Sequence, residues 1–527
     1  MKKLFYLVVT LFFGNSNNVY TQTNNSKYDN AWILGYCGEC GDSGYGGTRL
    51  TFNSDTLQID TVHTRAGMYL TNASICDRHG NLQFYTEGFR IYNKNHELMP
   101  QGDTLCPGDY YNYYATSSSG GTVYTDGGII YQGAIILPSF QDSNIYRVLH
   151  ERLFFPPLEL GRVDLLYCTT VDMSKNNGLG GIKSKSKIVI QQDSLANGKL
   201  TACRHANGQD WWVLVPSYKS NSYRRILVTS DSVQLLSRQS IGKATPLAGG
   251  QACFSPNGCY YVRYGGTSII GNIGVPNDLD IYNFDRSTGL LSNPVKINFA
   301  DSAYCFGVAI SPNSRFLYAS SLYFVYQFDL WASDIAASKI TVATYDGFID
   351  PLWVYGKTAF SIAQLAPDGK IYISAPGGNH YIHVIEYPDR SGLACELRQH
   401  TIRLPRYYLR AMPNFPNYRL GALQGSDSCP SLISASSDAP AEAPLGLVIQ
   451  PNPATDLLHI AYHTENTTAL TVAISDYTGK KLQTLSLDSA SGSLDINTSA
   501  LPNGLYLCTL YDSATHRQQS VKFVVMR

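Results

Sequence analysis

A strand–turn–strand unit that recurs along the chain is the feature that most restricts how this sequence can fold. Proline fixes φ, and Asn, Asp or Gly tolerates the turn conformation, so Pro-Asn and Pro-Asp tetrapeptides between short apolar runs predict tight hairpins. Three sharp copies have the turns Ser255–Gly258, Ser311–Ser314 and Ala366–Gly369. Weaker copies have their turns at Gly80, Asn144 and Gly208.

The spacing of these hairpins predicts a β-propeller. The turn tips fall near residues 80, 144, 208, 258, 314 and 369. Four-stranded sheets repeated at such intervals stack around an axis, because one blade cannot bury both of its faces alone. At this spacing, residues 30–421 favour seven blades, although six stay open. We expect closure by pairing of the segment Arg49–Phe52 with the chain near residues 400–418.

The first 21 residues have the pattern of an export signal. Lys2 and Lys3 precede an apolar run from Leu4 to Phe13, which is too short to span a bilayer and has the length of a signal-peptide core. A buried N-terminal strand is the alternative. No later stretch approaches 18 consecutive apolar residues, so we expect a secreted or surface protein without a transmembrane segment.

All twelve cysteines follow this segment, and an oxidising compartment would permit disulfides. Cys253 and Cys259 flank the turn 255–258, so they could join the two arms of one hairpin. Cys37 and Cys40 form a C-x-x-C in a glycine-rich loop. Without a second such pair or two histidines nearby, a local disulfide or free thiols suit this pair better than zinc. We therefore predict no metal centre.

The last quarter of the chain changes character. Residues 422–446 are rich in Ser, Ala and Pro and have few large apolar residues, which predicts a linker. Residues 447–527 then form short alternating runs separated by turn residues, a pattern that suits a small Ig-like β-sandwich. The predicted fold class is all-β, with a propeller, a linker and a sandwich in that order.

The predicted sandwich carries ordered motifs that resemble a known family. The motif residues are Pro451, Asn452 and Pro453, then Gly479 and Lys480, then Gly504 and Tyr506. In this order they resemble the C-terminal sorting domain of the type IX secretion system of Bacteroidetes. The resemblance implies handling by the type IX secretion machinery and passage across the outer membrane. It also implies removal of the tail, with surface attachment or release.

The propeller region resembles the WD40-like propellers of secreted Bacteroidetes proteins, which often precede such sorting domains. The residues that carry this likeness lie at 77–88, 91–100, 199–212 and 413–421. The motifs of that family define no functional residues. The resemblance therefore implies a fold and a route of export, and it implies no particular ligand.

Charge and motif content narrow the function classes. Lys plus Arg and Asp plus Glu both total 40, so net charge gives no reason to expect nucleic acid as a partner. No H-E-x-x-H, G-x-S-x-G or G-x-x-x-x-G-K-[ST] motif occurs, and we expect no catalytic residues and no enzyme. Asp278 and Asp280 could ligate calcium with loop carbonyls, but such residues more often cap a turn.

A tyrosine-rich loop is the candidate binding element. Residues 106–128 carry Tyr110, Tyr111, Tyr113 and Tyr114, followed by a Ser/Gly-rich run. Tyrosines in such loops give a large amphipathic contact area, although they could instead pack on a blade edge. We predict a surface-displayed binding or adhesion module for a glycan or a protein. The alternative is a propeller hydrolase or lyase that acts on an extracellular glycan or peptide through ionisable groups converging at the axis.

Overall fold

The computed structural model describes most of the chain as two compact units, residues 1–435 and 436–527. It describes residues 26–527 except for 37–43, 54–55, 117, 120–121, 124–126, 155–160, 245–248, 266–276, 300–304, 353–355, 424–428, 430–431, 433–445, 464–469, 477–479 and 513–516. The predicted signal peptide, residues 1–21, and the Cys37–Cys40 motif therefore lie outside the described residues.

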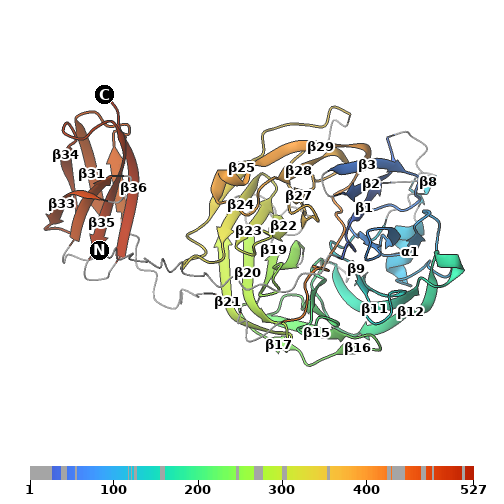
Figure 1. The fold of residues 1–527 in the computed structure, drawn as a ribbon. Coiled ribbons are helices and arrows are strands. Elements are labelled where there is room, and N and C mark those ends of the chain that lie inside the picture. Colours follow the sequence, from blue (N-terminus) through green and yellow to red (C-terminus); the bar gives the residue numbers. More distant parts are fainter. Residues whose placement is uncertain are drawn as a thin grey trace, which may run out of the picture. The chain divides into compact units, whose positions relative to one another are not determined.

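The first unit is a ring of antiparallel sheets, which confirms the predicted propeller (Figure 1). Seven sheets of three or more strands follow one another in its described residues, as the favoured blade number requires. Blade 1 consists of β1 (Ala31–Tyr36), β2 (Gly46–Phe52) and β3 (Leu57–Val62). Blade 2 consists of β4 (Ala73–Cys76), β5 (Leu82–Thr86) and β6 (Ile91–Asn93). Blade 3 consists of β9 (Ala134–Pro138), β10 (Ile145–Phe154), β11 (Arg162–Asp172) and β12 (Gly181–Ile190).

The other four blades have the same antiparallel order, with the first strand of each innermost. Blade 4 consists of β13 (Thr201–Arg204), β14 (Trp211–Pro216), β15 (Ser222–Val228), β16 (Val233–Leu235) and β17 (Gln239–Ser240). Blade 5 consists of β18 (Gln251–Phe254), β19 (Tyr260–Gly265), β20 (Asn277–Asp285) and β21 (Leu290–Phe299). Blade 6 consists of β22 (Cys305–Ile310), β23 (Phe316–Ser321), β24 (Phe324–Asp329) and β25 (Ile340–Thr344). Blade 7 consists of β26 (Ala363–Leu365), β27 (Ile371–Ile373), β28 (Asn379–Ile385) and β29 (Leu397–Tyr408).

The six turn tips found in the sequence are the turns between the innermost and second strands of blades 2 to 7. In the turn 255–258, the Ser255 hydroxyl accepts the backbone N–H of Tyr260 at 2.9 Å, and Asn257 Oδ1 accepts that of Cys259 at 3.0 Å. Gly258 has a φ of +76°, a conformation that glycine adopts without strain. The turn 311–314 repeats both side-chain bonds. The sequence shows no such turn for blade 1, because the connection from β1 to β2 spans residues 37–45 and is longer than a four-residue turn.

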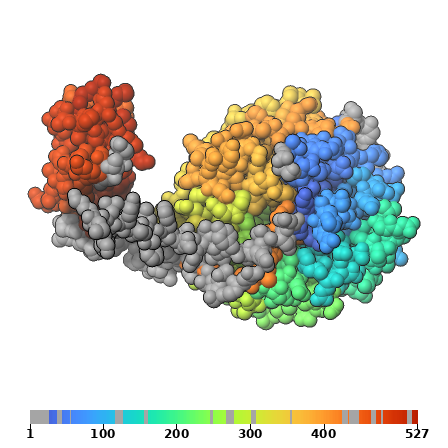
Figure 2. Space-filling model, viewed as in Figure 1, coloured from blue at the N-terminus to red at the C-terminus, as the bar shows by residue number. Residues whose placement is uncertain are grey.

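The ring is not closed by the strand pairing that we expected. Arg49–Phe52 lies in β2, which pairs with β1 and β3, whereas β29 pairs with β28. Blades 1 and 7 meet through side chains, with the rings of Trp32 and Tyr372 5.6 Å apart, and through a main-chain hydrogen bond from Tyr407 to the carbonyl of Gly44 at 2.9 Å. Figure 2 shows the blades in sequence order around the ring, from blue through green and yellow to orange. The chain after β29 runs into the middle of the ring (Figure 1).

The described helical segments are short. They are α1 (Asp109–Thr116) and the 3₁₀ turns η1 (Asn176–Gly178) and η2 (Gly392–Cys395). The tyrosine-rich segment that we predicted as a loop thus begins with α1, which the short strands β7 (Ser118–Ser119) and β8 (Thr122–Val123) follow. Within the described part of the chain, no helix has both the length and the apolar character needed to cross a membrane.

The second unit is a two-sheet β-sandwich. One sheet has the order β30 (Gly446–Gln450), β31 (Leu457–His463), β34 (Ser491–Asn497). The other has the order β33 (Lys481–Leu487), β32 (Leu470–Asp476), β35 (Gly504–Asp512), β36 (Arg517–Val525). Side chains from both sheets, among them Leu458, Ile474 and Phe523, form its apolar core.

The Pro451–Pro453 motif fastens one sheet of the sandwich to the last strand of the other. Asn452 Oδ1 accepts the backbone N–H of Val524 at 2.9 Å, and Asn452 Nδ2 donates to the carbonyl of Lys522 at 3.1 Å. These two bonds tie the loop after β30 to β36. The motif therefore has a structural role inside the sandwich.

The remaining motif residues lie at turns and strand starts. The backbone N–H of Lys480 donates to the Asp476 carboxylate at 3.1 Å, which closes the turn between β32 and β33. Gly479 lies outside the described residues. Gly504 begins β35, and the buried ring of Tyr506 stacks on Phe523 with 5.6 Å between centroids.

The first part of the predicted linker, residues 422–446, packs on the propeller. The backbone N–H of Leu423 donates to the carbonyl of Ala206 at 2.9 Å. Leu432 is buried in the apolar cluster of blades 5 and 6, and its N–H donates to Asn283 Oδ1 at 2.8 Å. Composition could not predict these contacts, because Ala and Ser occur both in packed segments and in solvated linkers.

The stacked pair Tyr506–Phe523 gives a first prediction. Tyr506→Ala removes a buried ring and should lower the free energy of unfolding of the sandwich by about 3–5 kcal/mol. Pulse proteolysis across a urea series would measure this as an earlier loss of the sandwich fragment. Leu505→Ala is the matched control, because Leu505 is exposed on the same strand. Equal midpoints for the two variants would contradict the assigned role of Tyr506.

Candidate functional site

The chain's own residues occupy the axis of the propeller. Residues 409–423, which we call the axial strap, follow β29 and pass from the end of the ring where the innermost strands begin to the end where their turns lie. Asn414 hydrogen-bonds at the first end, and Leu423 at the second. The strap buries the side chains of Ala411, Met412, Phe415, Tyr418 and Leu420. In Figure 1 it is the orange segment that crosses the middle of the ring.

The buried side-chain amides of Asn414, Gln132 and Gln251 hydrogen-bond to main-chain groups of the innermost strands at the first end of the axis. Asn414 Nδ2 donates to the carbonyls of Ala134 and Leu200 at 3.0 and 2.9 Å, and Asn414 Oδ1 accepts from Gln132 Nε2 at 3.1 Å. The Gln132 side chain also reaches across the axis to Ala252. Its Nε2 donates to the Ala252 carbonyl and its Oε1 accepts the Ala252 backbone N–H, both at 2.8 Å. Sequence analysis singled out none of these amides.

Gln251 extends the same network to the last two blades. Its Nε2 donates to the carbonyl of Ala363 at 2.7 Å, and its Oε1 accepts the backbone N–H groups of Val308 and Ala363 at 3.0 and 3.2 Å. The backbone N–H of Asn414 donates to the carbonyl of Asn72, and Asn72 Nδ2 reaches Ile33 of blade 1 at 2.7 Å. Together the amides connect all seven blades.

Aromatic and basic side chains hold the strap at the second end. The Tyr418 hydroxyl donates to the carbonyl of Ile136 at 2.7 Å, and the Tyr418 carbonyl accepts from Arg204 at 2.8 Å. Burial lowers the pKa of Arg204 to about 9. Arg419 makes a two-bond ion pair with Asp29, with both distances 2.7 Å. The strap side chains thus fill this end of the axis.

The four tyrosines of the predicted binding element have different surroundings. Tyr110 and Tyr111 are buried against Phe89, with ring centroids 4.9 and 5.6 Å away. Both hydroxyls are engaged: that of Tyr110 accepts the N–H of Ile129 at 2.8 Å, and that of Tyr111 donates to Asp103 at 2.7 Å. Tyr113 is 67% exposed, and Tyr114 is half-buried. Packing on the blade therefore explains Tyr110 and Tyr111, while Tyr113 faces solvent.

A thiol and an imidazole meet in the interior beside α1. Cys106 Sγ lies 3.2 Å from His150 Nδ1, and His150 Nε2 lies 3.0 Å from the Thr169 hydroxyl. All three are buried. Burial lowers the pKa of His150 to about 3 and raises the pKa of the Cys106 thiol. Both groups are therefore neutral, and the thiol is not an activated nucleophile in this enclosed arrangement.

Two buried carboxyl groups lie in the same region. Burial raises the pKa of Glu87 to about 7, although nearby Arg90 opposes the shift. Burial also raises the pKa of Glu151 well above its usual value, and the charge of Lys199 compensates for only part of the effect. Neither carboxyl oxygen of Glu151 has a hydrogen-bond partner among the described residues. Burial without a hydrogen-bond partner therefore favours the protonated form of Glu151.

An open cleft of about 380 Å³ lies at one end of blade 3. Its lining is formed by Phe154, Arg162, Asp164, Gln192, Asp193 and Ser194. The ring of Phe154 is 44% exposed, and the Arg162 guanidinium carbon lies 5.8 Å from the ring centroid. Asp164 pairs with Arg152 at 2.5 Å, and Asp193 pairs with Arg224. The cleft thus combines an apolar ring with carboxylates whose charges are already balanced.

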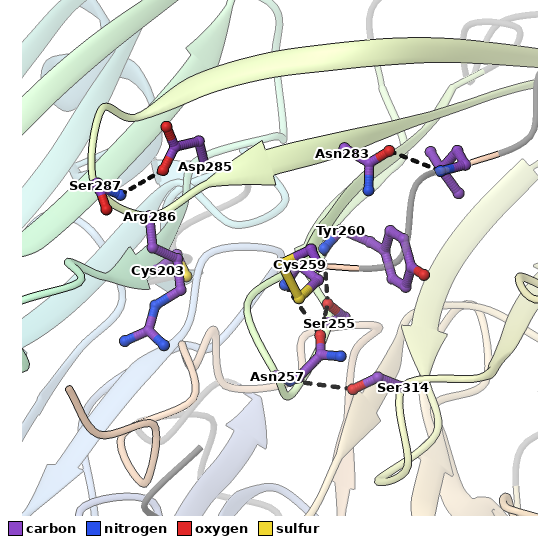
Figure 3. Close-up of a disulfide and its surroundings, with 12 residues drawn as sticks. Cys203, Ser255, Asn257, Cys259, Tyr260, Asn283, Asp285, Arg286, Ser287 and Ser314 are labelled. Carbon is purple, nitrogen blue, oxygen red and sulfur yellow. Dashed lines mark hydrogen bonds between the residues drawn. A yellow bond between two sulfur atoms is a disulfide. The ribbon is translucent and has the colours of Figure 1, made fainter. Parts of the chain in front are cut away.

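The predicted disulfide is wrong in one partner. Cys259 bonds to Cys429 (Figure 3), and Cys253 is a free thiol. Cys253 faces Val262 in the β18–β19 ladder, while Cys259 follows the turn and has no cross-strand partner on β18. The two cysteines flank the same turn but do not lie opposite one another, so the hairpin register prevents the bridge that their spacing suggested.

The two acids proposed as calcium ligands are engaged by cations of the chain. Asp280 pairs with Arg263 at 2.9 Å, and both side chains are almost fully buried. Lys296 Nζ lies 3.0 Å from Asp278 and 3.7 Å from Asp280. No cluster of three or more potential metal-ligating side chains occurs in the described residues. These ion pairs account for both carboxylates without a bound cation.

The comparisons with known proteins decide what the tail is. Residues 448–526 match the family described as the secretion system C-terminal sorting domain. The tail is a type IX sorting domain. The sorting domain indicates secretion to the cell surface or outside the cell, as predicted. Among curated proteins, no sequence matches the chain.

The chain is similar to solved structures at low sequence identity. PorZ, a surface component of the type IX secretion system of Porphyromonas gingivalis, is 12% identical, with 92% of this chain and 74% of that one covered and a TM-score of 0.28. The β-propeller domain of Cps50 from Myceliophteria thermophila is 8% identical, with 67% and 95% covered and a TM-score of 0.35. The periplasmic gluconolactonase PpgL of Pseudomonas aeruginosa is 12% identical, with 72% and 96% covered and a TM-score of 0.33.

The prediction that the chain is not an enzyme is contradicted. The structures of similar fold include the gluconolactonase PpgL, which is an enzyme by its name. The prediction relied on missing hydrolase motifs, and a site on this fold can be built from residues that leave no such motif in the sequence. At this level of likeness the comparison concerns the fold alone and transfers no activity to this chain.

The axial amides generate a second prediction. Asn414→Ala leaves the buried carbonyls of Ala134 and Leu200 without their side-chain donor. It also removes one of the two acceptors of Gln132 Nε2, which keeps its bond to Ala252. Each unsatisfied buried group costs about 1–3 kcal/mol, so the free energy of unfolding should fall by about 3–5 kcal/mol in a urea titration. Asn298→Ala, at an exposed position, is the control and should change it by less than about 0.5 kcal/mol. A similar small change for Asn414→Ala would refute the role of the network.

The buried carboxyl of Glu151 generates a third prediction. Its folded-state pKa is raised, so the folded protein retains a proton that the unfolded chain releases, and the stability falls as the pH rises above the usual Glu value of 4.5. Glu151→Gln removes this dependence. Melting temperatures of the variant and the wild type should agree near pH 4.5 and diverge toward pH 7.5, with the variant higher. Glu97→Gln, which changes an exposed carboxyl, is the control, and a Glu151→Gln variant without any pH-dependent gain over the wild type would contradict the assignment.

Proposed function

We propose that this chain is an exported propeller that binds an extracellular glycan, and that its sorting domain delivers it to the place where the glycan occurs. The observation that supports the proposal is the cleft beside Phe154. A sugar ring presents an apolar C–H face, which packs on an exposed aromatic ring. Its hydroxyl groups pair with carboxylates, guanidinium groups and amides, which Asp164, Arg162 and Gln192 offer here.

The charge balance of the cleft favours a sugar over a small ion. Asp164 and Asp193 are each paired with an arginine of the chain, so they can accept hydrogen bonds without needing a cationic ligand. Gln192 has a φ of +54°, which is uncommon for a residue other than glycine and occurs often at ligand sites. The axial strap supports the same choice of site, because it occupies the axial position where propellers often bind ligands.

The fourth prediction tests this site directly. A glycan array probed with the purified full-length protein should identify a retained glycan class. Phe154→Ala should weaken that binding at least tenfold, which corresponds to about 1.4 kcal/mol. Leu235→Ala is the matched control, since it truncates an exposed apolar side chain on blade 4. Tyr113→Ser adds a separate arm for the exposed tyrosine of α1.

Three outcomes would count against the proposal. Unchanged binding by Phe154→Ala would place the site elsewhere. Capture of a surface protein, with no glycan retained, would favour the adhesion reading with a protein ligand. Shortening of the retained glycan during incubation, followed by chromatography, would assign the chain to the hydrolases or lyases.

A further inference from the structure

The Cys259–Cys429 disulfide fastens the far end of the axial strap to blade 5. Cys259 is buried directly after the turn 255–258, and Cys429 lies six residues beyond Leu423, the last residue of the strap. Leu432, three residues further on, is anchored by its hydrogen bond to Asn283 (Figure 3). The disulfide therefore joins the strap covalently to the body of the propeller just before the chain leaves for the sorting domain.

The strap needs an attachment at this end. It adds no strand to any sheet of the propeller, so no continuous ladder of main-chain bonds holds it. Its near end is continuous with β29. Its far end is held by individual contacts, among them Arg419 with Asp29 and the bond of Leu423 to Ala206. Chain ends with isolated contacts fray first, and a cut in the chain beyond Ala435 would create such an end.

We propose that the Cys259–Cys429 disulfide is a latch that keeps the axial strap inside the ring when the chain is cut between Ala435 and Gly446. With the disulfide intact, loss of the sorting domain does not change the stability of the propeller. Tension on the tail reaches the hydrogen bond of Leu432 first and then the covalent bond at Cys429, which passes it into the β18–β19 hairpin, so it does not pull on residues 409–423. The inference rests on the proposed function only in that delivery by the sorting domain is followed by loss of the tail.

The experiment uses the full-length protein with a protease recognition sequence inserted between Ala435 and Gly446. Three forms are compared before and after cleavage: the parent, the double variant with Cys259→Ser and Cys429→Ser, and the control Cys253→Ser, which removes a free thiol from the same blade. Melting temperature and amide hydrogen exchange of residues 411–421 are measured for each.

We expect cleavage to leave the parent and the control unchanged within about 1 °C, since the latch holds the new end. In the double variant, cleavage should lower the melting temperature by about 5 °C and speed exchange of residues 411–421 at least tenfold. An equal response of the parent and the double variant to cleavage would overturn the proposal.

A second route keeps the test decisive if the double variant does not fold. The folded, cleaved parent is treated with a phosphine reductant and then alkylated, and mass spectrometry confirms that the two new labels are on Cys259 and Cys429. Reduction should then reproduce the faster exchange, and an unchanged exchange rate would overturn the latch. Neither arm involves glycan binding or secretion, so a failed latch and a failed functional proposal give different results.

Discussion

The buried amide of Asn414 is the point on which the geometry of the ring depends. The innermost strand of each blade presents main-chain N–H and C=O groups toward the axis, where water is excluded, and buried groups of this kind need partners. Neighbouring blades cannot supply all of them, because their innermost strands splay apart around the axis. Asn414, Gln132 and Gln251 supply the missing donors and acceptors, and through Asn72 the network reaches every blade. Part of it comes from the strap, so the ring and the strap are one cooperative structure.

This constraint explains several otherwise separate features. Blades 1 and 7 share no ladder, and the strap bonds to blades on both sides of the axis. The rings of Phe415 and Tyr418 fill the axis, and Trp32 and Trp211 pack against them. The strap then needs a fixed end, which Cys429 provides. The strap fills the axis, and the cleft of Phe154 on blade 3 is a surface where an aromatic ring and paired charges lie together.

The sequence predicted what local chemistry determines and missed what depends on distant partners. The turns 255–258 and 366–369 carry their own conformational signal, so the hairpins and the propeller could be derived, and seven blades could be favoured while six stayed open. The sorting motifs are similarly local. Gln132 and Asn414, in contrast, are ordinary polar residues 282 positions apart, and nothing near either one shows that they meet. The segment 413–421 was noticed only for its family likeness. The disulfide prediction was wrong for the same reason, because the true partner of Cys259 lies 170 residues away. The cleft of Phe154 is lined by residues of β10, of β11 and of the segment after β12, so no regular spacing in the sequence marks it.

Amide hydrogen exchange of the unmodified protein tests the central claim most directly. If the strap is an integral part of the ring, residues 411–421 should exchange as slowly as the innermost strand β18, and both should lose protection together as denaturant is added. Fast exchange of the strap while β18 stays protected would contradict the account, because the ring would then hold together without the segment that fills its axis.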